Sequence, residues 1–273
     1  MMQVLINGAH SQLGKELTKL IPDVIALEPE DMDLCDRMSV RRFITRNHIG
    51  LIINCASYGS PYSLDKDSEN AKKINFVGPR NLAKTGRKMI YISTNSVFDG
   101  LSGKPYSPTD PTHPLSVFGQ TKLMGEKAVL QFSHESVVIR TGWLYSHCGK
   151  NILKRIQKQA SENSELEFAS NIIGAPCYAP DLANAIIKII PEMDRLNRGV
   201  YHFANSGICS EYDFASAVVK QLNLDCKLKP IPVFEETVPT NGALDTTKTT
   251  DVFGVKMENW QDALARCINQ MSR

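Results

Sequence analysis

The sequence has no long apolar run and no excess of charge of one sign, and we expect no secretory leader. No run of about 18 consecutive apolar residues occurs in the 273-residue chain, so a membrane-spanning helix is not expected. Residues 1–6 have no basic lead-in and are too short for the apolar region of a signal peptide. Lys and Arg number 31 against 29 Asp and Glu, and the net charge of +2 gives no strong field for holding nucleic acid or a membrane surface.

Paired cysteines are absent as well. The seven cysteines are scattered, and no two of them have the CxxC spacing of a zinc site or a redox pair. We therefore expect no disulfide framework and no metal site, and a cytoplasmic location, because unpaired thiols persist in a reducing compartment. The length suits one large or two modest domains, and an apolar content of 42% is ordinary for a soluble globular protein.

Short apolar runs alternate with helical patterns through the first half of the chain. Such alternation implies right-handed crossovers and a parallel sheet covered by helices on both faces, which is a doubly wound α/β fold. The predicted strands are Val4–Asn7, Val24–Leu27, Leu51–Cys55, Met89–Ser93 and Val137–Arg140. The predicted helices are Gln12–Leu20, Met38–Arg46, Asn70–Lys84 and Pro114–Phe132.

The second half is less regular. Helical patterns there are separated by short β-like pieces, such as Gly199–Ala204, and by a proline-rich stretch from Pro230 to Pro239. We interpret this half as a smaller C-terminal lobe on the substrate side. The predicted division is residues 1–150 for a dinucleotide-binding domain and 151–273 for the lobe, with chain from the second half crossing the boundary. The predicted helices of this half are Asn151–Ala160, Asp181–Ile190, Tyr212–Leu222 and Trp260–Met271.

A glycine-containing turn follows the first predicted strand and opens a helix. Free N–H groups and the dipole of such a helix attract a phosphate. Gly8 suits a tight turn and Gly14 suits close packing of helix on strand, whereas a P-loop is excluded because Lys15 is not followed by Ser or Thr. Ser11 stands where a middle glycine would let backbone approach a diphosphate, so its hydroxyl either hinders the phosphate or caps the helix. The turn alone leaves an ordinary βα connection open.

Residues after the second and third strands extend the same interpretation. Glu28 follows the turn by about 20 residues, where a carboxylate can hold a ribose 2′-hydroxyl and favours NAD over NADP; a solvated loop carboxylate is the alternative. Asp33 and Leu34 follow as an edge for an adenine pocket, and small residues near Ser57 and Tyr58 leave room for a coenzyme. The candidate coenzyme contacts are Gly8, Ser11, Gln12, Leu13, Gly14, Glu28, Asp33, Leu34, Ser57 and Tyr58.

A series of motifs in a fixed order carries a family resemblance over nearly the whole chain. These motifs are GAHSQLG at 8–14, NCASY at 54–58, LDK at 64–66, STNSVFDG at 93–100, FGQTKLMGEK at 118–127, RTGWLY at 140–145, GAPCYAPDLA at 174–183, YHFANSG at 201–207 and, more weakly, VPTNGALD at 238–245. With them the chain resembles the extended short-chain dehydrogenase/reductases, and within these the dTDP-4-dehydrorhamnose reductase family. The β regulatory subunit of methionine adenosyltransferase belongs to the same branch.

The resemblance implies a Rossmann-type fold, an NAD(P) coenzyme and a Thr, a Tyr and a Lys that carry the chemistry. Tyr and Lys four residues apart lie on one face of a helix, where the phenol protonates the carbonyl oxygen and the Lys holds the nicotinamide ribose. By this resemblance Thr94 matches the Thr, Lys122 matches the Lys, and Trp143 lines a sugar-nucleotide site. The Tyr position is Phe118, which has no proton to give.

Further departures fall on the same region. Asn95 and Ser96 stand where the family has an acidic residue and a Tyr, and Thr94, Asn95 and Trp143 are the predicted substrate contacts. The other departures are Asn171 and Ile172 in place of Asp-Gln, Glu211 in place of a Trp, and Val238 in place of an Arg. Hydroxyl or imidazole groups near site motifs that could replace the phenol are Tyr58, Tyr145, His113 and Ser116.

Two hypotheses of different class follow. The first is an NAD(P)H-dependent reductase of a nucleotide-linked 4-keto-6-deoxysugar, with its chemistry impaired by the missing phenol. The second is a catalytically silent protein that binds NAD(P) or a nucleotide sugar and regulates a partner enzyme. A divergent epimerase is weaker, because it too needs an acid/base pair, and the sequence leaves open whether the chain forms a homodimer.

Overall fold

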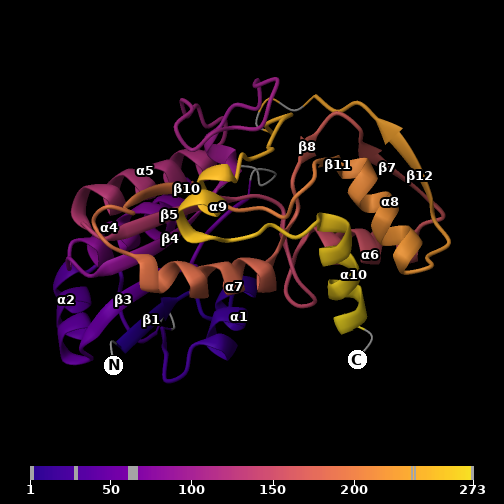
Figure 1. The fold of residues 1–273 in the computed structure, drawn as a ribbon. Helices are drawn as coiled ribbons and strands as arrows, with labels where there is room; N and C mark the ends of the chain where they lie inside the picture. Colours follow the sequence, from indigo (N-terminus) through magenta and orange to yellow (C-terminus); the bar gives the residue numbers. More distant parts are fainter. Residues whose placement is uncertain (1–2, 28–29, 61–66, 235, 237, 272–273) are drawn as a thin grey trace.

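Six parallel strands form the centre of the computed structural model, which describes residues 3–27, 30–60, 67–234, 236 and 238–271. Their order across the sheet is β10-β5-β4-β3-β1-β2, and each neighbouring pair is parallel (Figure 1). The strands are β1 (Gln3–Asn7), β2 (Ile25–Leu27), β3 (Ile49–Asn54), β4 (Lys88–Thr94), β5 (Ser136–Thr141) and β10 (Gly199–His202). This arrangement confirms the predicted doubly wound α/β class.

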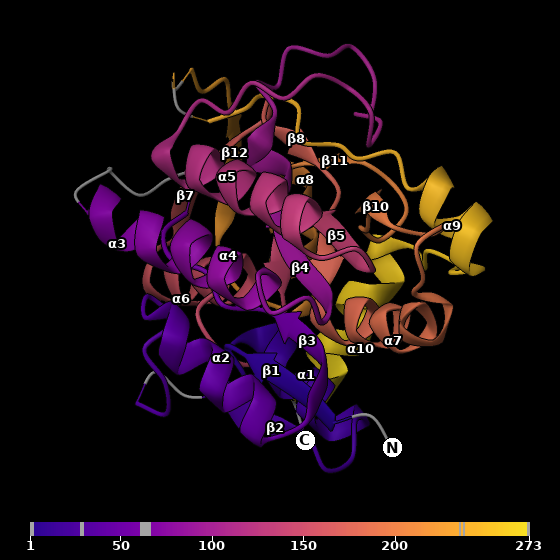
Figure 2. The same cartoon turned by 90° about the vertical axis from the view of Figure 1, so that its left-hand side faces the viewer.

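Helices cover both faces of the sheet, as Figure 2 shows. Successive side chains of a strand point to opposite faces, so Ile6 packs with Leu17 of the first layer while Leu5 packs with Val40 and Val129 of the second. Both faces of the strands are therefore apolar, which explains their continuous apolar runs. The first layer holds α1 (Gln12–Leu20) and α7 (Ala179–Ile189), and the second holds α2 (Arg37–Arg46), α4 (Gly78–Ala83) and α5 (Val117–Phe132).

The helix predicted at Asn70–Lys84 is present and contains a π-helical segment. The structure has α3 (Ser68–Lys72), then a π-helical segment, Lys73–Val77, and then α4. Pro79 in the first turn of α4 has no N–H to bond the carbonyl of Asn75 four residues earlier. That carbonyl instead accepts a hydrogen bond from the buried Tyr91 hydroxyl at 2.8 Å. The helical prediction is therefore confirmed for residues 70–83, with a π-helical segment where the freed carbonyl binds Tyr91 of β4.

The second half forms a smaller lobe, which Figure 1 shows gathered to one side of the sheet. Its core contains Leu153, Phe214, Trp260 and Leu264, all buried. The lobe helices are α6 (Ile152–Glu162), α8 (Glu211–Gln221) and α10 (Trp260–Met271). Its strand pairs are β7 (Glu165–Ala169) with β12 (Lys227–Ile231), β6 (Leu144–Tyr145) with β9 (Cys177–Tyr178), and β8 (Ile173–Gly174) with β11 (Cys209–Ser210).

The chain crosses between the two parts. After entering the lobe it returns to supply α7 and β10 to the sheet layers, followed later by α9 (Thr247–Phe253) beside β10. The division into residues 1–150 and 151–273 therefore stays a prediction about folding units. In the described part of the chain, no helix combines the length and the apolar character needed to cross a bilayer.

Candidate functional site

The turn between β1 and α1 is closed by contacts of backbone on backbone. A Cβ on Gly14 would lie 2.3 Å from the Gly8 carbonyl oxygen, and a Cβ on Gly8 would lie 2.5 Å from the Ala56 nitrogen after β3. Gly8 also has a φ of +80°, in the region that glycine adopts without strain. The turn thus meets the end of β3 at the point where the strand order reverses, the usual ligand crevice of an open α/β sheet.

Ser11 caps α1 in this turn. Its hydroxyl accepts a hydrogen bond from the Gly14 N–H at 3.0 Å, which is the second of the two roles that the sequence left open. Leu13 is buried in the core beneath the sheet, so it can offer a ligand only its backbone. The N-terminus of α1, with its free N–H groups, lies at this crevice, and a helix N-terminus there favours a phosphate.

Gln12 links this helix to the lobe. Its side-chain oxygen accepts hydrogen bonds from the Ser146 hydroxyl at 3.0 Å and from the Asn151 amide at 2.8 Å. Asn151 also caps α6. The sequence predicted Gln12 as a coenzyme contact but gave no sign of this bridge, because its partners lie more than 130 residues further along the chain.

The residues predicted near the adenine lie further along the same edge. Asp33 accepts a hydrogen bond from the Cys35 N–H at 2.8 Å, and the Leu34 carbonyl accepts one from the Asn81 amide at 2.9 Å. Both residues are thus fixed by local hydrogen bonds. Glu28, the predicted ribose contact, lies outside the described residues.

Asn75 of the π-helical segment clamps the loop after β3. Its amide oxygen accepts from the Tyr58 N–H and its amide nitrogen donates to the Tyr58 carbonyl, both at 2.9 Å, and the same nitrogen donates to Thr121 on α5 at 3.0 Å. Asn75 is fully buried. Sequence reasoning missed it, because an Asn inside a helical pattern gives no sign of which distant backbone it will bind.

A cavity of about 540 Å³ runs from the start of α1 across the ends of β3, β4 and β5 to the lobe. The lobe contributes Arg155 of α6 and Ile172 to its wall. Of the predicted site residues, the structure brings together Gln12, Ser57, Thr94, Asn95, Phe118, Lys122 and Trp143 around this cavity. The predicted residues outside its wall are Gly8, Ser11, Leu13, Gly14, Asp33, Leu34 and Tyr58.

Phe118 and Lys122 face the cavity from consecutive turns of α5. The Lys122 ammonium donates to the Ile92 carbonyl at 2.5 Å and lies 4.4 Å from the centre of the Tyr91 ring. Burial lowers the pKa of Lys122 to about 8, although the nearby Glu126 carboxylate opposes the shift. The cavity wall therefore contains a cation that can lose its proton close to neutral pH.

Thr94 ends β4 with its hydroxyl in a small polar group. It accepts from the Ser96 N–H at 3.1 Å and lies 3.2 Å from the Ser96 hydroxyl. The Asn95 amide oxygen accepts from the Thr94 hydroxyl at 3.4 Å, and its amide nitrogen donates to the Gly242 carbonyl at 2.9 Å, where a Cβ on residue 242 would lie 2.4 Å from that nitrogen. Asn95 therefore ties β4 to the segment that follows the proline-rich stretch.

Trp143 holds the wall between β5 and the lobe. Its φ of +42° is unusual for a bulky residue, and its ring packs on Gly174, where a Cβ would lie 3.0 Å from the indole. Strained backbone of this kind persists only where the surroundings fix it, and it gathers at ligand sites. Trp143 is thus oriented by the fold toward the cavity, in keeping with its predicted place in a sugar site.

A buried ion pair holds α5 in place beneath these residues. Arg140 of β5 donates to both carboxylate oxygens of Glu126, with the shortest contact at 2.7 Å, and the Ser93 hydroxyl donates to the same carboxylate at 2.5 Å. Both charged side chains are nearly inaccessible to solvent. The sequence offered one signal that went unused, a lone Arg inside an otherwise apolar strand.

None of the four groups considered as substitutes for the missing phenol lines the cavity. The Tyr58 hydroxyl donates to Asp67 at 3.1 Å, and that hydrogen bond raises the pKa of the phenol. Tyr145 is buried in the lobe core, where loss of solvent raises its pKa. His113 is exposed beside Asp99, and Ser116 caps α5 by accepting from the Gly119 N–H.

The residues present fit a dinucleotide with a nicotinamide end. The glycine turn has no room for side chains, Asn75 fixes the loop after β3 by hydrogen bonds, and the buried Lys122 ammonium and Thr94 hydroxyl stand at the far end of the cavity. Among the described residues of the cavity wall there is no tyrosine and no histidine. The site therefore provides a coenzyme cleft without the phenol that the resemblance leads one to expect.

The fold and this crevice define a Rossmann-type protein of the reductase kind, and comparison with known proteins gives its family. The chain matches the RmlD substrate binding domain over residues 2–273 and belongs to that family. Spore coat polysaccharide biosynthesis protein SpsK of Bacillus subtilis (strain 168) is 31% identical, over 100% of this chain and 99% of the relative. The dTDP-4-dehydrorhamnose reductase of Aggregatibacter actinomycetemcomitans is 31% identical over 97% of both.

Comparison with solved structures indicates the same family. A dTDP-4-dehydrorhamnose reductase from Clostridium acetobutylicum superposes with a TM-score of 0.93 at 30% identity over 100% of both chains. The enzyme of that name from Bacillus anthracis, solved in complex with NADP, gives 0.91 at 28% identity over 99% of both. The predicted family resemblance is thereby confirmed.

Proposed function

We propose that the protein binds a reduced nicotinamide dinucleotide and reduces the 4-keto group of a nucleotide-linked 6-deoxysugar. The reaction is slow because Phe118 replaces the tyrosine whose phenol would donate the proton. The observation that carries this proposal is the single cavity that joins the start of α1 to Thr94 and Lys122 and then to Trp143 and Arg155. The relatives named as dTDP-4-dehydrorhamnose reductases support the choice of substrate class. The preference for NAD rests on Glu28 in the sequence alone.

Each residue of the cleft has a role in this proposal. The bound reduced nicotinamide supplies a hydride to the keto carbon. Thr94 donates its hydroxyl hydrogen to the keto oxygen, and Lys122 binds the ribose hydroxyls beside the nicotinamide. Asn95 and Trp143 form the wall against the sugar, and the Arg155 guanidinium attracts the diphosphate of the sugar nucleotide.

The proton that the new alkoxide needs comes from a weaker source than a positioned phenol. Among the described titratable groups of the wall, burial raises the pKa of Cys55 to about 12, whereas that of Lys122 is lowered to about 8. We assign the proton to the Lys122 ammonium, which donates it directly or through a water. Loss of a positioned general acid typically slows such a step by about 10²–10⁴-fold.

The test restores the phenol. Phe118→Tyr places a hydroxyl on a ring that already lines the cavity, and we expect the rate of NADH or NADPH oxidation with a dTDP-4-keto-6-deoxysugar to rise by about 10²–10⁴-fold. The control is Phe132→Tyr, at the last residue of the same helix and outside the cavity wall. Wild-type turnover equal to that of Phe118→Tyr would show that another group already supplies the proton.

Phe118 also favours a second candidate, a regulatory protein that binds NAD(P) or a nucleotide sugar without turnover. This candidate predicts that coenzyme and sugar nucleotide bind in fluorescence titrations while neither wild type nor Phe118→Tyr oxidises NADH. Absence of coenzyme binding by both proteins contradicts both candidates.

We also propose a cytoplasmic location, because all seven cysteines, each in the described chain, are free thiols. Association with a second copy or with a partner enzyme belongs to the same proposal, and size-exclusion chromatography with light scattering measures it directly.

A further inference from the structure

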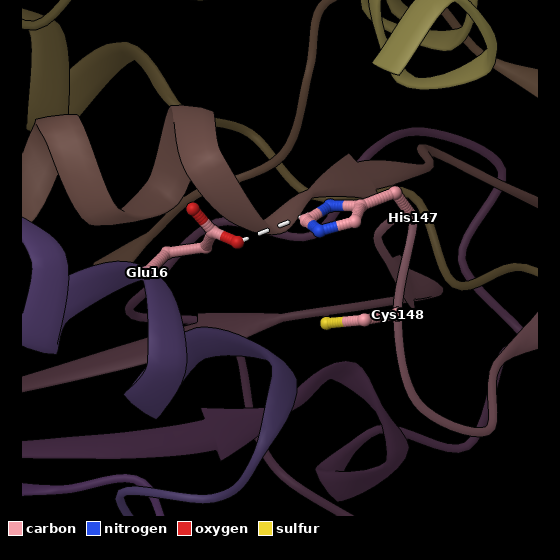
Figure 3. Close-up of side chains that lie close together, drawn as sticks. All are labelled: Glu16, His147 and Cys148. Atoms are coloured by element: carbon pink, nitrogen blue, oxygen red, sulfur yellow. Dashed lines mark ion pairs between the residues drawn. The ribbon is translucent and has the colours of Figure 1, made fainter. Parts of the chain in front are cut away.

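Three side chains that the coenzyme site does not use converge between α1 and the lobe. Glu16 projects from α1, and His147 and Cys148 come from the loop that follows β6 (Figure 3). One carboxylate oxygen, one ring nitrogen and the thiol sulfur all lie within 4.8 Å of one another. The sequence gave no sign of this group, because its members are far apart along the chain and have no metal-ligand spacing.

We propose that Glu16, His147 and Cys148 form a binding site for a divalent transition metal of the zinc type. Zinc takes a thiolate at about 2.3 Å and imidazole or carboxylate at about 2.0–2.2 Å, which places neighbouring ligand atoms about 3.6 Å apart in a tetrahedron. The observed separations thus need to close by only about 1 Å. Thiolate and imidazole select zinc-type ions over Mg²⁺ and Ca²⁺.

The imidazole supplies an independent sign of a ligand position. Nδ1 of His147 is buried and makes no hydrogen bond among the described residues. It lies 4.0 Å from Oε1 of Glu16, too far for a hydrogen bond and suited to an ion between the two atoms. A buried ring nitrogen without a hydrogen bond is costly unless it has such a partner.

The loop that carries two of the ligands is already fixed in place. The Asn151 amide donates to the carbonyls of Ser146 and Cys148 at 3.0 and 3.1 Å, and the Ser146 hydroxyl accepts from the Cys148 N–H at 3.3 Å. Gln12, one turn before Glu16 on α1, accepts from both Asn151 and Ser146. Supporting hydrogen bonds of this kind orient metal ligands and typically change affinity by about 10–100-fold.

The charges of the three side chains suit a divalent cation, but Lys19 competes with the cation for Glu16. A thiolate and a carboxylate offset the two positive charges of the ion, and the imidazole binds as a neutral ligand. Lys19 pairs with Glu16 at 2.9 Å, but more than half of its side chain is exposed, so it can swing into solvent. Removing the Lys19 charge is therefore expected to strengthen metal binding.

The test uses the full chain, freed of metal and of any affinity tag, with Zn²⁺ and Co²⁺ as probes. In competition with a chromophoric chelator we expect Zn²⁺ to bind, and Cys148→Ser, His147→Asn and Glu16→Gln each to weaken it by more than about 10-fold. The matched controls Cys226→Ser and His134→Asn, outside the group, keep wild-type affinity. Lys19→Gln binds zinc several-fold more tightly than wild type.

Two further readouts keep the test decisive if a variant folds poorly. Co²⁺ on wild type shows a thiolate-to-metal charge-transfer band that Cys148→Ser lacks, and Zn²⁺ slows alkylation of Cys148 but not of Cys226, measured by mass spectrometry. Zinc binding that is the same in Cys148→Ser as in wild type overturns the proposal. So does a cobalt spectrum without the thiolate band, which would leave Glu16 and His147 as a simple ion pair. None of these outcomes depends on coenzyme or sugar turnover.

Discussion

The two ends of the cleft are constrained in different ways. At the dinucleotide end, Gly8 and Gly14 sit where backbone leaves no room for a side chain, so their identity is set by packing alone. At the other end, Phe118 lines the cavity of about 540 Å³. Backbone packing therefore restricts the residue type in the glycine turn, whereas Phe118 faces open space in the cavity.

Glu126→Gln tests how much the buried ion pair beneath Phe118 and Lys122 contributes to stability, for comparison with the glycine turn. This change leaves the buried Arg140 charge without its counter-ion, and we expect the free energy of unfolding to fall by about 3–5 kcal/mol. Urea denaturation measures the loss. Glu135→Gln removes a partly exposed partner of Lys88 and should cost less than about 1 kcal/mol. Equal losses in the two variants would mean that α5 is not held by the ion pair.

Lys122→Met tests how much the buried charge of Lys122 lowers the stability of the fold. The folded pKa of about 8 lies below the usual 10.5, so the unfolded chain holds this proton more tightly than the folded chain does. Below pH 8, burial of the charged Lys122 lowers the free energy of unfolding by its full amount. As the pH rises from 8 to 10.5 the folded protein loses this proton, and the free energy of unfolding rises by about 3 kcal/mol in total.

The measurement is the difference in unfolding free energy between wild type and Lys122→Met across that range. Stability of wild type should rise relative to the variant as pH increases, while the exposed Lys127→Met follows wild type. A constant difference between wild type and Lys122→Met would contradict the lowered pKa.

Gly8→Ala probes the dinucleotide end. Its new Cβ would clash with the Ala56 backbone and also strain a φ of +80°, and we expect about 1–3 kcal/mol of destabilisation together with loss of coenzyme binding. Gly86→Ala is a matched control, because its φ of +71° carries the same strain while nothing lies within 4 Å of the added atom. Thermal unfolding that is the same for both variants would show that the clash is relieved by movement of the loop.

Ser11→Gly should have the smallest effect on stability. The hydroxyl caps α1, and replacing such a cap by glycine costs only about a few tenths of a kcal/mol. Coenzyme affinity gives the more informative result. Tighter NADH binding by Ser11→Gly would show that the side chain hinders the diphosphate, whereas weaker binding would show that its hydroxyl contacts the phosphate.

Local patterns predicted much of this molecule. The apolar runs located the strands, the glycine spacing located the turn, and the interval between Phe118 and Lys122 placed both on one face of α5. What escaped prediction depends on contacts between distant parts of the chain. The Asn75 side chain binds the Tyr58 backbone 17 residues earlier in the chain, and Gln12 binds Asn151 of the lobe 139 residues later.

Codons for phenylalanine and tyrosine differ at their middle base alone. Position 118 is therefore one transversion away from a phenol, in a cleft whose ammonium, hydroxyl and glycine turn are all still in place. Under the proposed function, one base change is therefore enough to give the cleft the hydroxyl that the reaction uses.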